Sequence, residues 1–238
     1  MRKALVTGAS RGIGYAIAKK LLQNDFAVVI TGRNISNLEC VARELGKNVF
    51  PMVWNAMEFD KAEEKINKSA NILDGLDTVV NNAGIFAQRN EWDKNSLLKT
   101  TAKEWQDVIN VNASAVFFTM QAAVNYMLKN DIKGNILNIT SVAGEEPVYG
   151  AYGGSKILAT GLTRGWGKMF AADGITINGI ATEMNNWHEG DSMKHDRIPY
   201  GRFATIDEIA NLAMYLLSDN AKMICGETVI FDGGYSIR

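Results

Sequence analysis

The chain has few of the residues from which metal centres and disulfide frameworks are built. Its 238 residues include two cysteines, Cys40 and Cys225, and two histidines, His188 and His195. The cysteines lie far apart without a CxxC or Cys/His cluster, so we expect neither a disulfide framework nor a structural zinc site. The histidines lack carboxylates at metal spacing, and we therefore expect no metal site. This cysteine usage fits a reducing, cytoplasmic setting.

Proline, long apolar runs and an excess of positive charge are also lacking. With three prolines and no low-complexity tract, no linker is evident, and we predict one domain over residues 1–238. No apolar run approaches the roughly 20 residues that span a bilayer, and we expect neither a membrane span nor a signal peptide. The 25 basic and 26 acidic residues do not form the basic footprint of a nucleic-acid binder. Small molecules or other proteins remain as partners.

Short apolar runs alternate with longer segments of helical period along most of the chain. The runs rich in Val and Ile predict strands at 4–7, 27–31, 49–54, 76–81, 135–140, 175–181 and 227–231. The intervening helices are predicted at 12–24, 35–46, 58–71, 101–129, 151–172 and 205–218. Because strands buried on both faces and each followed by a helix indicate a parallel sheet, we predict a doubly wound, Rossmann-type α/β fold. The irregular stretch 183–202 is predicted to be a lid over the substrate.

A glycine-rich segment, TGASRGIG, follows the first predicted strand and opens the first predicted helix. A dinucleotide pyrophosphate rests at this position on free backbone N–H groups and on the positive end of a helix dipole. The GxxxGxG spacing differs from the commonest GxGxxG fingerprint, and an ordinary tight turn would also use glycines. We favour nucleotide binding and assign to it the loop residues Gly8, Ser10, Arg11, Gly12, Ile13 and Gly14.

Charge at the end of the second predicted strand indicates which dinucleotide binds. A carboxylate there binds a ribose 2′-hydroxyl, whereas a basic side chain accommodates a 2′-phosphate. Here Arg33 follows the strand with no carboxylate nearby, and Arg11 could approach the same phosphate from the glycine loop. Either arginine alone could be a solvated surface charge. Both together, with the acid missing, favour NADP(H) over NAD(H).

A second group of side chains suits proton transfer to a carbonyl oxygen. Tyr152 and Lys156 stand at i and i+4 on the predicted helix 151–172, so they share a face. We expect the ammonium to lower the pKa of the phenol from about 10 toward neutrality, so that the phenol can donate a proton in reduction and accept it in oxidation. Ser141, at the end of a predicted strand, could hydrogen-bond the same oxygen. Asn112 is a fourth candidate, because its amide could hold a water behind the lysine.

The Tyr-x-x-x-Lys pattern occurs twice, and its context separates the two copies. Tyr15 and Lys19 follow the glycine loop without a strand-end serine before them, so we interpret them as a solvated pair on the first helix. Tyr149 has no lysine four residues on, and we assign it to a loop or substrate contact. The copy at Tyr152 is therefore the predicted centre of proton transfer.

Taken together, these motifs resemble those of the short-chain dehydrogenase/reductase family nearly end to end. TGASRGIG resembles the family's TGxxxGxG cofactor loop, and NNAG at 81–84 matches its strand-four signature. The resemblance implies that Asn82, Ala83 and Gly84 border the cofactor. It also implies a catalytic tetrad formed by Asn112, Ser141, Tyr152 and Lys156.

The same resemblance implies roles within that tetrad and a relationship to one group of enzymes. Lys156 would also bind the nicotinamide ribose, and Asn112 would hold the water of a proton relay. The opening of the chain and its tail from 201 to 238 are similar to those of bacterial 3-oxoacyl carrier-protein reductases. A homotetramer or homodimer is implied as well. Large apolar groups on helices fit either such an interface or core packing: Phe117, Phe118, Met120 and Trp166.

The sequence departs from the family pattern in three respects. Thr182 and Glu183 replace the usual Pro-Gly after the sixth strand, and Trp187 lies near the position of a threonine that helps hold the nicotinamide. Asn55 stands where an acid commonly meets the adenine, and its amide could still accept and donate hydrogen bonds. Asp173 reverses the sign of a basic residue that helps attract acyl carrier protein. Trp187 is interpreted as an apolar wall over the substrate or as a packing residue.

We predict an NADP(H)-dependent oxidoreductase that interconverts a ketone and a secondary alcohol. A 3-oxoacyl thioester is the first substrate candidate. A small polar or biosynthetic-intermediate ketone is the second, because of Asp173 and the altered lid. The rival from another class is a non-catalytic, NADP(H)-sensing binding protein. Loss of the tyrosine or the lysine would mark that state, and both are present.

Overall fold

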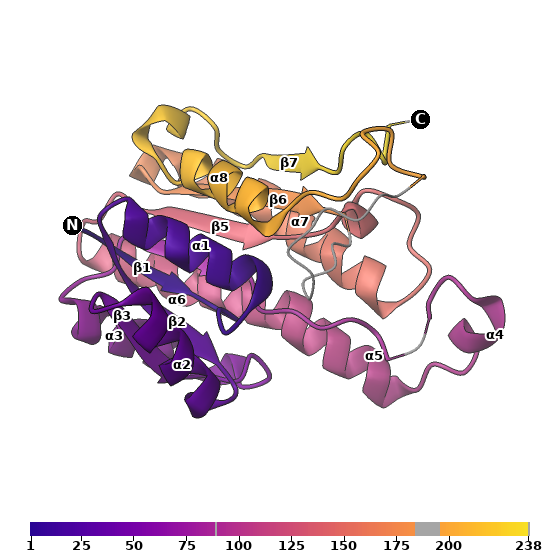
Figure 1. Cartoon of the computed structure of the whole chain (residues 1–238), viewed down its shortest axis with the longest axis horizontal. Coiled ribbons are helices and arrows are strands. Elements are labelled where there is room, and N and C mark those ends of the chain that lie inside the picture. The colour runs from indigo at the N-terminus through magenta and orange to yellow at the C-terminus, as the bar shows by residue number, and fades with distance from the viewer. Residues whose placement is uncertain (89, 184–195, 238) are drawn as a thin grey trace.

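A seven-stranded parallel sheet forms the centre of the molecule (Figure 1). The computed structural model describes residues 1–88, 90–183 and 196–237. The strands lie in the order β3-β2-β1-β4-β5-β6-β7, and every neighbouring pair is parallel. Their bounds are β1 Arg2–Val6, β2 Phe26–Gly32, β3 Val49–Val53, β4 Thr78–Asn81, β5 Asn135–Ile139, β6 Thr176–Thr182 and β7 Thr228–Phe231. The predicted doubly wound fold is confirmed.

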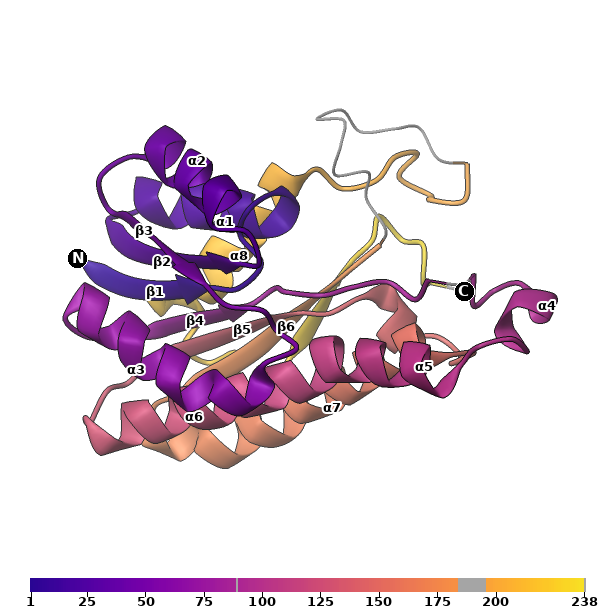
Figure 2. The same cartoon turned by 90° about the horizontal axis from the view of Figure 1, so that it is seen from below.

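Helices cover both faces of the sheet (Figure 2). One face carries α1 Gly12–Gln23, α2 Ile35–Leu45 and α8 Ile206–Leu216. The other carries α3 Ala62–Leu73, α5 Ala102–Ile109, α6 Ala115–Lys129 and α7 Ala151–Phe170. A short helix that the sequence pattern did not predict, α4 (Lys94–Leu97), lies beyond the carboxyl ends of the strands. The predicted helix 101–129 is divided, because a π-helical turn, Asn110–Ser114, joins α5 to α6.

The apolar residues of the strands pack into two separate hydrophobic cores, one on each face of the sheet. On β1, Val6 packs with α1, α2 and α8, whereas Leu5 packs with α3 and α6. Ile30 and Val29 of β2 divide between the two cores in the same way. Successive strand residues point to opposite faces, so a strand covered on both sides is apolar along most of its length.

The order in which successive strands are added to the sheet reverses between β1 and β4. Strands β2 and β3 lie on one side of β1, and β4 to β7 lie on the other. The loops that leave β1 and β4 therefore run side by side, and the Thr7 hydroxyl accepts hydrogen bonds from the backbone N–H groups of Asn82 (3.0 Å) and Ala83 (3.1 Å). Ligands of open α/β sheets bind at such a switch point, outside the carboxyl ends of the strands.

Only part of the predicted lid at 183–202 is described. Its centre, 184–195, with Trp187, His188 and His195, lies outside the described residues. The later part is anchored, because Tyr200 N–H donates to Gly233 O at 3.0 Å and the Arg202 guanidinium forms hydrogen bonds of 2.7 and 2.8 Å with Glu208.

The second Tyr-x-x-x-Lys copy is solvated only in part, since Lys19 is exposed as predicted whereas Tyr15 has a partner. Tyr15 is half-buried against the core of α1, and its hydroxyl donates to Glu44 at the end of α2. Burial, followed by the hydrogen bond and the charge of Glu44, raises the pKa of Tyr15 to about 12. Tyr15 thus joins two helices and is remote from the predicted centre.

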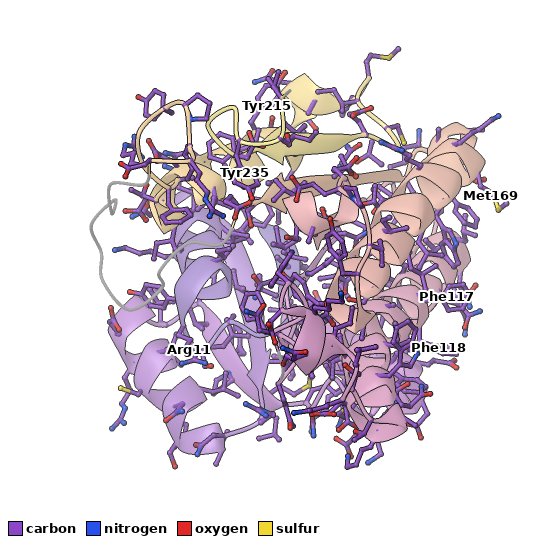
Figure 3. All side chains as sticks on the ribbon, turned by 90° about the vertical axis from the view of Figure 1, so that its right-hand side faces the viewer. Arg11, Phe117, Phe118, Met169, Tyr215 and Tyr235 are labelled. Carbon is purple, nitrogen blue, oxygen red and sulfur yellow. The ribbon has the colours of Figure 1, made fainter. Side chains whose placement is uncertain are left out.

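The large apolar groups on α6 and α7 divide between core and surface. Met120 is fully buried, whereas Phe117 and Phe118 are partly exposed along the side of the molecule that also carries Met169 (Figure 3). Phe117 contacts Trp166 edge to face, with ring centroids 5.4 Å apart. Core packing therefore accounts for Met120, and an aromatic cluster joins α6 to α7.

The described part of the chain holds neither a candidate membrane span nor a candidate metal-ligand cluster. Within residues 1–88, 90–183 and 196–237, no helix is long and apolar enough to cross a membrane. In the same part of the chain, no three His, Cys, Asp or Glu side chains gather as metal ligands.

Candidate active site

The glycine loop between β1 and α1 needs its glycines for two physical reasons. Gly8 and Gly12 adopt φ values of 66° and 61°, in the left-handed region that side chains disfavour. Gly14 needs space, because a Cβ there would lie 2.4 Å from the Asn82 side chain and 2.6 Å from Gly8 O. The Asn82 amide itself braces the loop, donating to Thr7 O at 2.9 Å and Gly8 O at 3.0 Å. The loops after β1 and β4 are thus one packed unit.

The first turn of α1 suits an anion. Its N-cap is Arg11, in extended conformation, and arginine has no acceptor with which to cap the helix. Gly12, Ile13 and Gly14 follow without a carboxylate. The N–H groups and the positive dipole end of α1 therefore face a site fitted for a phosphate.

A cavity of about 580 Å³ opens along the carboxyl ends of the strands. Gly84 borders it, where a Cβ would stand 3.4 Å from Asn112 Oδ1 and 3.8 Å from Lys156 Nζ. The predicted site residues that line it are Gly8, Ser10, Arg11, Ile13, Arg33, Asn55, Asn82, Ala83, Gly84, Ser141, Tyr152 and Lys156. The structure thus brings together the predicted nucleotide end and the predicted proton-transfer end.

Five predicted site residues lie off the cavity lining or outside the described residues. Gly12 and Gly14 are buried beneath the glycine loop, where they shape it. Asn112 is 1% exposed and lies behind Gly84. Tyr149 is 57% exposed and is not part of the lining. Trp187 lies outside the described residues.

Arg11, Arg33 and Asn55 mark the nucleotide end of the cavity. Arg11 and Arg33 are exposed, as expected for side chains that meet a phosphate in solvent. Asn55 follows β3, where its Oδ1 accepts the Met57 N–H at 3.2 Å. Its second lone pair and its NH₂ group remain chemically able to bond an adenine edge.

Tyr152, Lys156 and Ser141 lie together at the other end. Lys156 Nζ lies 5.7 Å from the centre of the Tyr152 ring and donates to Ile139 O at 3.2 Å. Ser141 caps a short 3₁₀ turn, Val142–Gly144, through a 3.2 Å bond from Ala143 N–H. Gly144 lets that turn approach α7, because a Cβ there would lie 2.8 Å from the Lys156 backbone.

The predicted lowering of the Tyr152 pKa is wrong for this structure. The pKa is raised to about 12, chiefly by burial and to a smaller extent by the charges of Glu183 and Glu91, while the hydrogen bond with Ser141 partly offsets the rise. Burial also lowers the pKa of Lys156, to about 8. Desolvation disfavours every charged form, so it moves a phenol and an ammonium in opposite directions. At neutral pH both groups carry their protons.

Asn112 lies in the π-helical turn between α5 and α6. The Ala115 N–H bonds to Asn110 O, five residues back, and such turns often occur at functional sites. The Asn112 side chain exchanges two 2.8 Å bonds with the backbone of Ile85 and donates to Ser155 Oγ at 3.2 Å. Its NH₂ group thus already has two partners. The amide holds the loop after β4 against α7, and the predicted water contact stays a prediction.

Sequence reasoning missed three residues around Tyr152. The Phe86 ring stacks on the Tyr152 ring, with centroids 4.8 Å apart. Glu91 is 5% exposed and accepts the Tyr152 backbone N–H. Glu183 lines the cavity and raises the Tyr152 pKa. The sequence drew attention only to Glu183, which stands where the family usually has part of a Pro-Gly pair. Phe86 and Glu91 lie in a loop whose sequence shows no periodicity.

The doubly wound sheet, the glycine loop at its switch point and the cavity beside it define a Rossmann-type protein of the dinucleotide-binding class. A family model described as enoyl-(acyl carrier protein) reductase matches residues 8–236. The chain belongs to the short-chain dehydrogenase/reductase family of oxidoreductases. The resemblance drawn from the sequence motifs is confirmed at this level.

Curated relatives match over nearly the whole chain. The 3-oxoacyl-[acyl-carrier-protein] reductase of Staphylococcus epidermidis is 33% identical over 246 residues, covering 98% of this chain and 98% of that protein. The enzyme of the same name from Aquifex aeolicus is 34% identical over 245 residues, covering 97% of this chain and 96% of that protein.

Solved structures agree with the fold. A putative short-chain alcohol dehydrogenase from Sinorhizobium meliloti superposes with a TM-score of 0.87 at 30% identity, covering 98% of this chain and 96% of that chain. A variant of actinorhodin polyketide ketoreductase, solved with NADPH, gives a TM-score of 0.88 at 24% identity, covering 100% of this chain and 98% of that chain. At that identity the second likeness concerns the fold alone.

Proposed function

We propose that the chain is an NADP(H)-dependent oxidoreductase that reduces a ketone to a secondary alcohol, reversibly, with Tyr152 as the acid/base. One observation supports this most: a single cavity is lined both by the glycine loop and by Ser141, Tyr152 and Lys156. Relatives named 3-oxoacyl-[acyl-carrier-protein] reductases add support, since that name describes reduction of a ketone.

Tyr152, Ser141 and Lys156 each have a separate role in the proposed reaction. A bound nicotinamide supplies the hydride that adds to the carbonyl carbon. Tyr152 is protonated at neutral pH, because its pKa is about 12, and gives its proton to the carbonyl oxygen, which becomes the more basic alkoxide. Ser141 hydrogen-bonds that oxygen as charge develops. The Lys156 ammonium binds the nicotinamide ribose and stabilises the phenolate that remains.

Cofactor choice follows from the two arginines at the nucleotide end. Arg33 and Arg11 line the cavity and can form charge-assisted hydrogen bonds with a 2′-phosphate. We expect Arg33→Asp to weaken NADPH binding by about ten- to a hundredfold, because an attraction becomes a repulsion, and to change NADH binding by less than about threefold. Fluorescence titration of both cofactors measures this.

Arg43→Asp is the matched control, because it makes the same charge change on the exposed surface of α2. It should leave both affinities as in the parent. Equal weakening of NADPH and NADH by Arg33→Asp would contradict the choice of NADP(H).

Two substrate classes have support within the proposed reaction. The names of the relatives favour a 3-oxoacyl thioester. The Glu183 carboxylate favours a small polar ketone instead, because it lines the cavity beside Tyr152 where the family usually has Pro-Gly. A carboxylate there disfavours long apolar acyl chains, which would have to desolvate it, and suits hydroxyl or amine substituents.

A screen of NADPH oxidation across acyl thioesters, cyclic ketones and keto sugars tests the proposed function. Turnover on any of these carbonyl compounds supports it, and the best substrate distinguishes the two classes. A protein that binds NADPH but reduces none of the panel would favour the rival role of an NADP(H)-sensing binding protein.

Partners in this proposal are the small carbonyl or alcohol substrate and further copies of the chain, with neither nucleic acid nor a membrane involved. We propose a homotetramer or a homodimer, supported by the partly exposed aromatic cluster of Phe117 and Trp166 beside Met169, which is 69% exposed. Light scattering should give a mass of two or four chains, and a monomer would contradict this.

A further inference from the structure

The helix that carries Tyr152 and Lys156 begins without a cap of its own. Its N-cap is Gly150, which has no side chain, and its first turn, AYGG, contains no acidic residue. The first N–H groups of a helix lack intrahelical acceptors, and a buried helix end needs partners from elsewhere. The loop that follows β4 lies against the start of α7, since its Phe86 ring stacks on Tyr152.

Glu91, sixty-one residues earlier in the chain, supplies that acceptor. The Tyr152 backbone N–H donates to both of its carboxylate oxygens, at 2.8 and 3.1 Å. Glu91 is only 5% exposed, so the bond is sheltered from water. A carboxylate at a helix N-terminus also interacts favourably with the helix dipole. The bonded N–H belongs to the tyrosine itself, which ties the position of the phenol to this carboxylate.

Gly150 is the glycine that this contact requires. A Cβ at position 150 would lie 2.5 Å from Glu91 Cδ and 2.6 Å from Oε1. The backbone of Gly150 is extended, with φ −153° and ψ −162°, a conformation open to any residue. Glycine is therefore needed here for the approach of the carboxylate rather than for its own dihedral angles.

The same loop fixes Tyr152 at a second point and Asn112 at a third. The Phe86 ring stacks on the phenol at 4.8 Å, and Ile85 exchanges two 2.8 Å bonds with the Asn112 amide. The loop thus contacts the ring of Tyr152 through Phe86 and its backbone through Glu91. Both contacts restrict where the Tyr152 side chain can lie at the start of α7.

We propose that Glu91 is a positioning residue for ketone reduction: by capping α7 at the Tyr152 N–H, it fixes the distance from the phenol to the carbonyl oxygen. The inference rests on the proposed function. It assigns to Glu91 no contact with substrate or cofactor. Displacement of a reacting group by about 1 Å can cost about a hundredfold in rate, so the loss of such a cap should appear in kcat.

Three variants test the proposal by steady-state kinetics. We expect Glu91→Ala to lower kcat by about ten- to a hundredfold, with the KM for NADPH changed by less than about threefold, because the nucleotide end is untouched. Glu91→Gln keeps one acceptor oxygen in the same place and should recover most of kcat. Asp93→Ala is the matched control, since it removes the carboxylate that caps α4 from the same loop, and it should behave as the parent.

Gly150→Ala supplies a test that leaves Glu91 in the chain. Its methyl group should displace the carboxylate and reproduce the loss seen in Glu91→Ala. The double variant should lose no more than either single one, because both remove the same bond. Additive losses, or a parent-like kcat in Glu91→Ala, would overturn the proposal.

Hydrogen exchange of the first turn of α7 reports the cap without turnover. Glu91→Ala and Gly150→Ala should speed exchange there at least about tenfold, whereas Asp93→Ala should not. Unchanged exchange overturns the proposed cap. A parent that reduces no ketone overturns the proposed function instead, and the exchange result still decides whether Glu91 holds Tyr152.

Discussion

Tyr152→Phe should abolish most ketone reduction while leaving NADPH binding intact. The substitution removes one hydroxyl and keeps the ring that stacks on Phe86 at 4.8 Å, so α7 and the cavity should not change. A positioned acid contributes about 10² to 10⁴ in rate, and we expect kcat to fall by that factor. The KM for NADPH should stay within about threefold, since Lys156 and the glycine loop, which we expect to hold most of the cofactor, are unchanged.

Tyr15→Phe is the control for this prediction. Tyr15 belongs to the other Tyr-x-x-x-Lys copy, and its hydroxyl donates to Glu44 between α1 and α2. Its loss should cost some stability and no turnover. Parent-like turnover by Tyr152→Phe would remove Tyr152 from the proposed chemistry, whereas loss of turnover together with loss of NADPH binding would indicate a collapsed cavity.

The fold could be predicted from local patterns because a parallel sheet leaves a strong local signature. The inner strands are buried on both faces, so apolar residues follow one another with few polar interruptions, as in the FAVVI run of β2. The glycine loop was equally readable, since Gly8 and Gly14 are required by backbone conformation and close contact. The π-helical turn at Asn110–Ser114 left no such signal, because its residues fit a regular helix.

The electrostatics of the site could not be predicted from spacing. The i, i+4 relation of Tyr152 and Lys156 is correct, but the sign of the pKa shift depends on burial, which is a property of the assembled cavity. The partners of Tyr15 and Tyr152 show the same limit. Glu44 and Glu91 come from 29 and 61 residues away, and no local pattern relates such distant positions.

Lys156→Met should make the protein more stable and nearly inactive. Lys156 is 7% exposed, and burial holds its pKa at about 8 instead of 10.5. The variant loses the ammonium that would bind the ribose and stabilise the phenolate, so kcat/KM should fall by about a hundredfold or more. It also loses the cost of burying a charge, while the apolar stem of the lysine is replaced by a side chain of similar length.

The stability gain should depend on pH in a defined direction. Between pH 8 and 10.5 the unfolded chain keeps a proton that the folded protein has released, so the unfolding free energy of the parent rises with pH across this window. The free-energy cost of burying the Lys156 ammonium is fully present below pH 8, where it amounts to at most about 3 kcal/mol. It is absent above pH 10.5, where lysine is neutral in both states. The unfolding free energy of Lys156→Met should therefore exceed that of the parent most at neutral pH, and the two should converge as the pH approaches 10.5.

Urea unfolding at pH 7, 8, 9 and 10 measures this difference. Lys168→Met is the control, since Lys168 lies exposed on the same helix, and its stability should stay within about 0.5 kcal/mol of the parent at each pH. A Lys156→Met protein that is less stable than the parent at pH 7 would mean that the bond from Lys156 to Ile139 O outweighs the desolvation of the ammonium. A more stable, inactive variant would instead show that the buried Lys156 ammonium destabilises the fold while it supports the reaction.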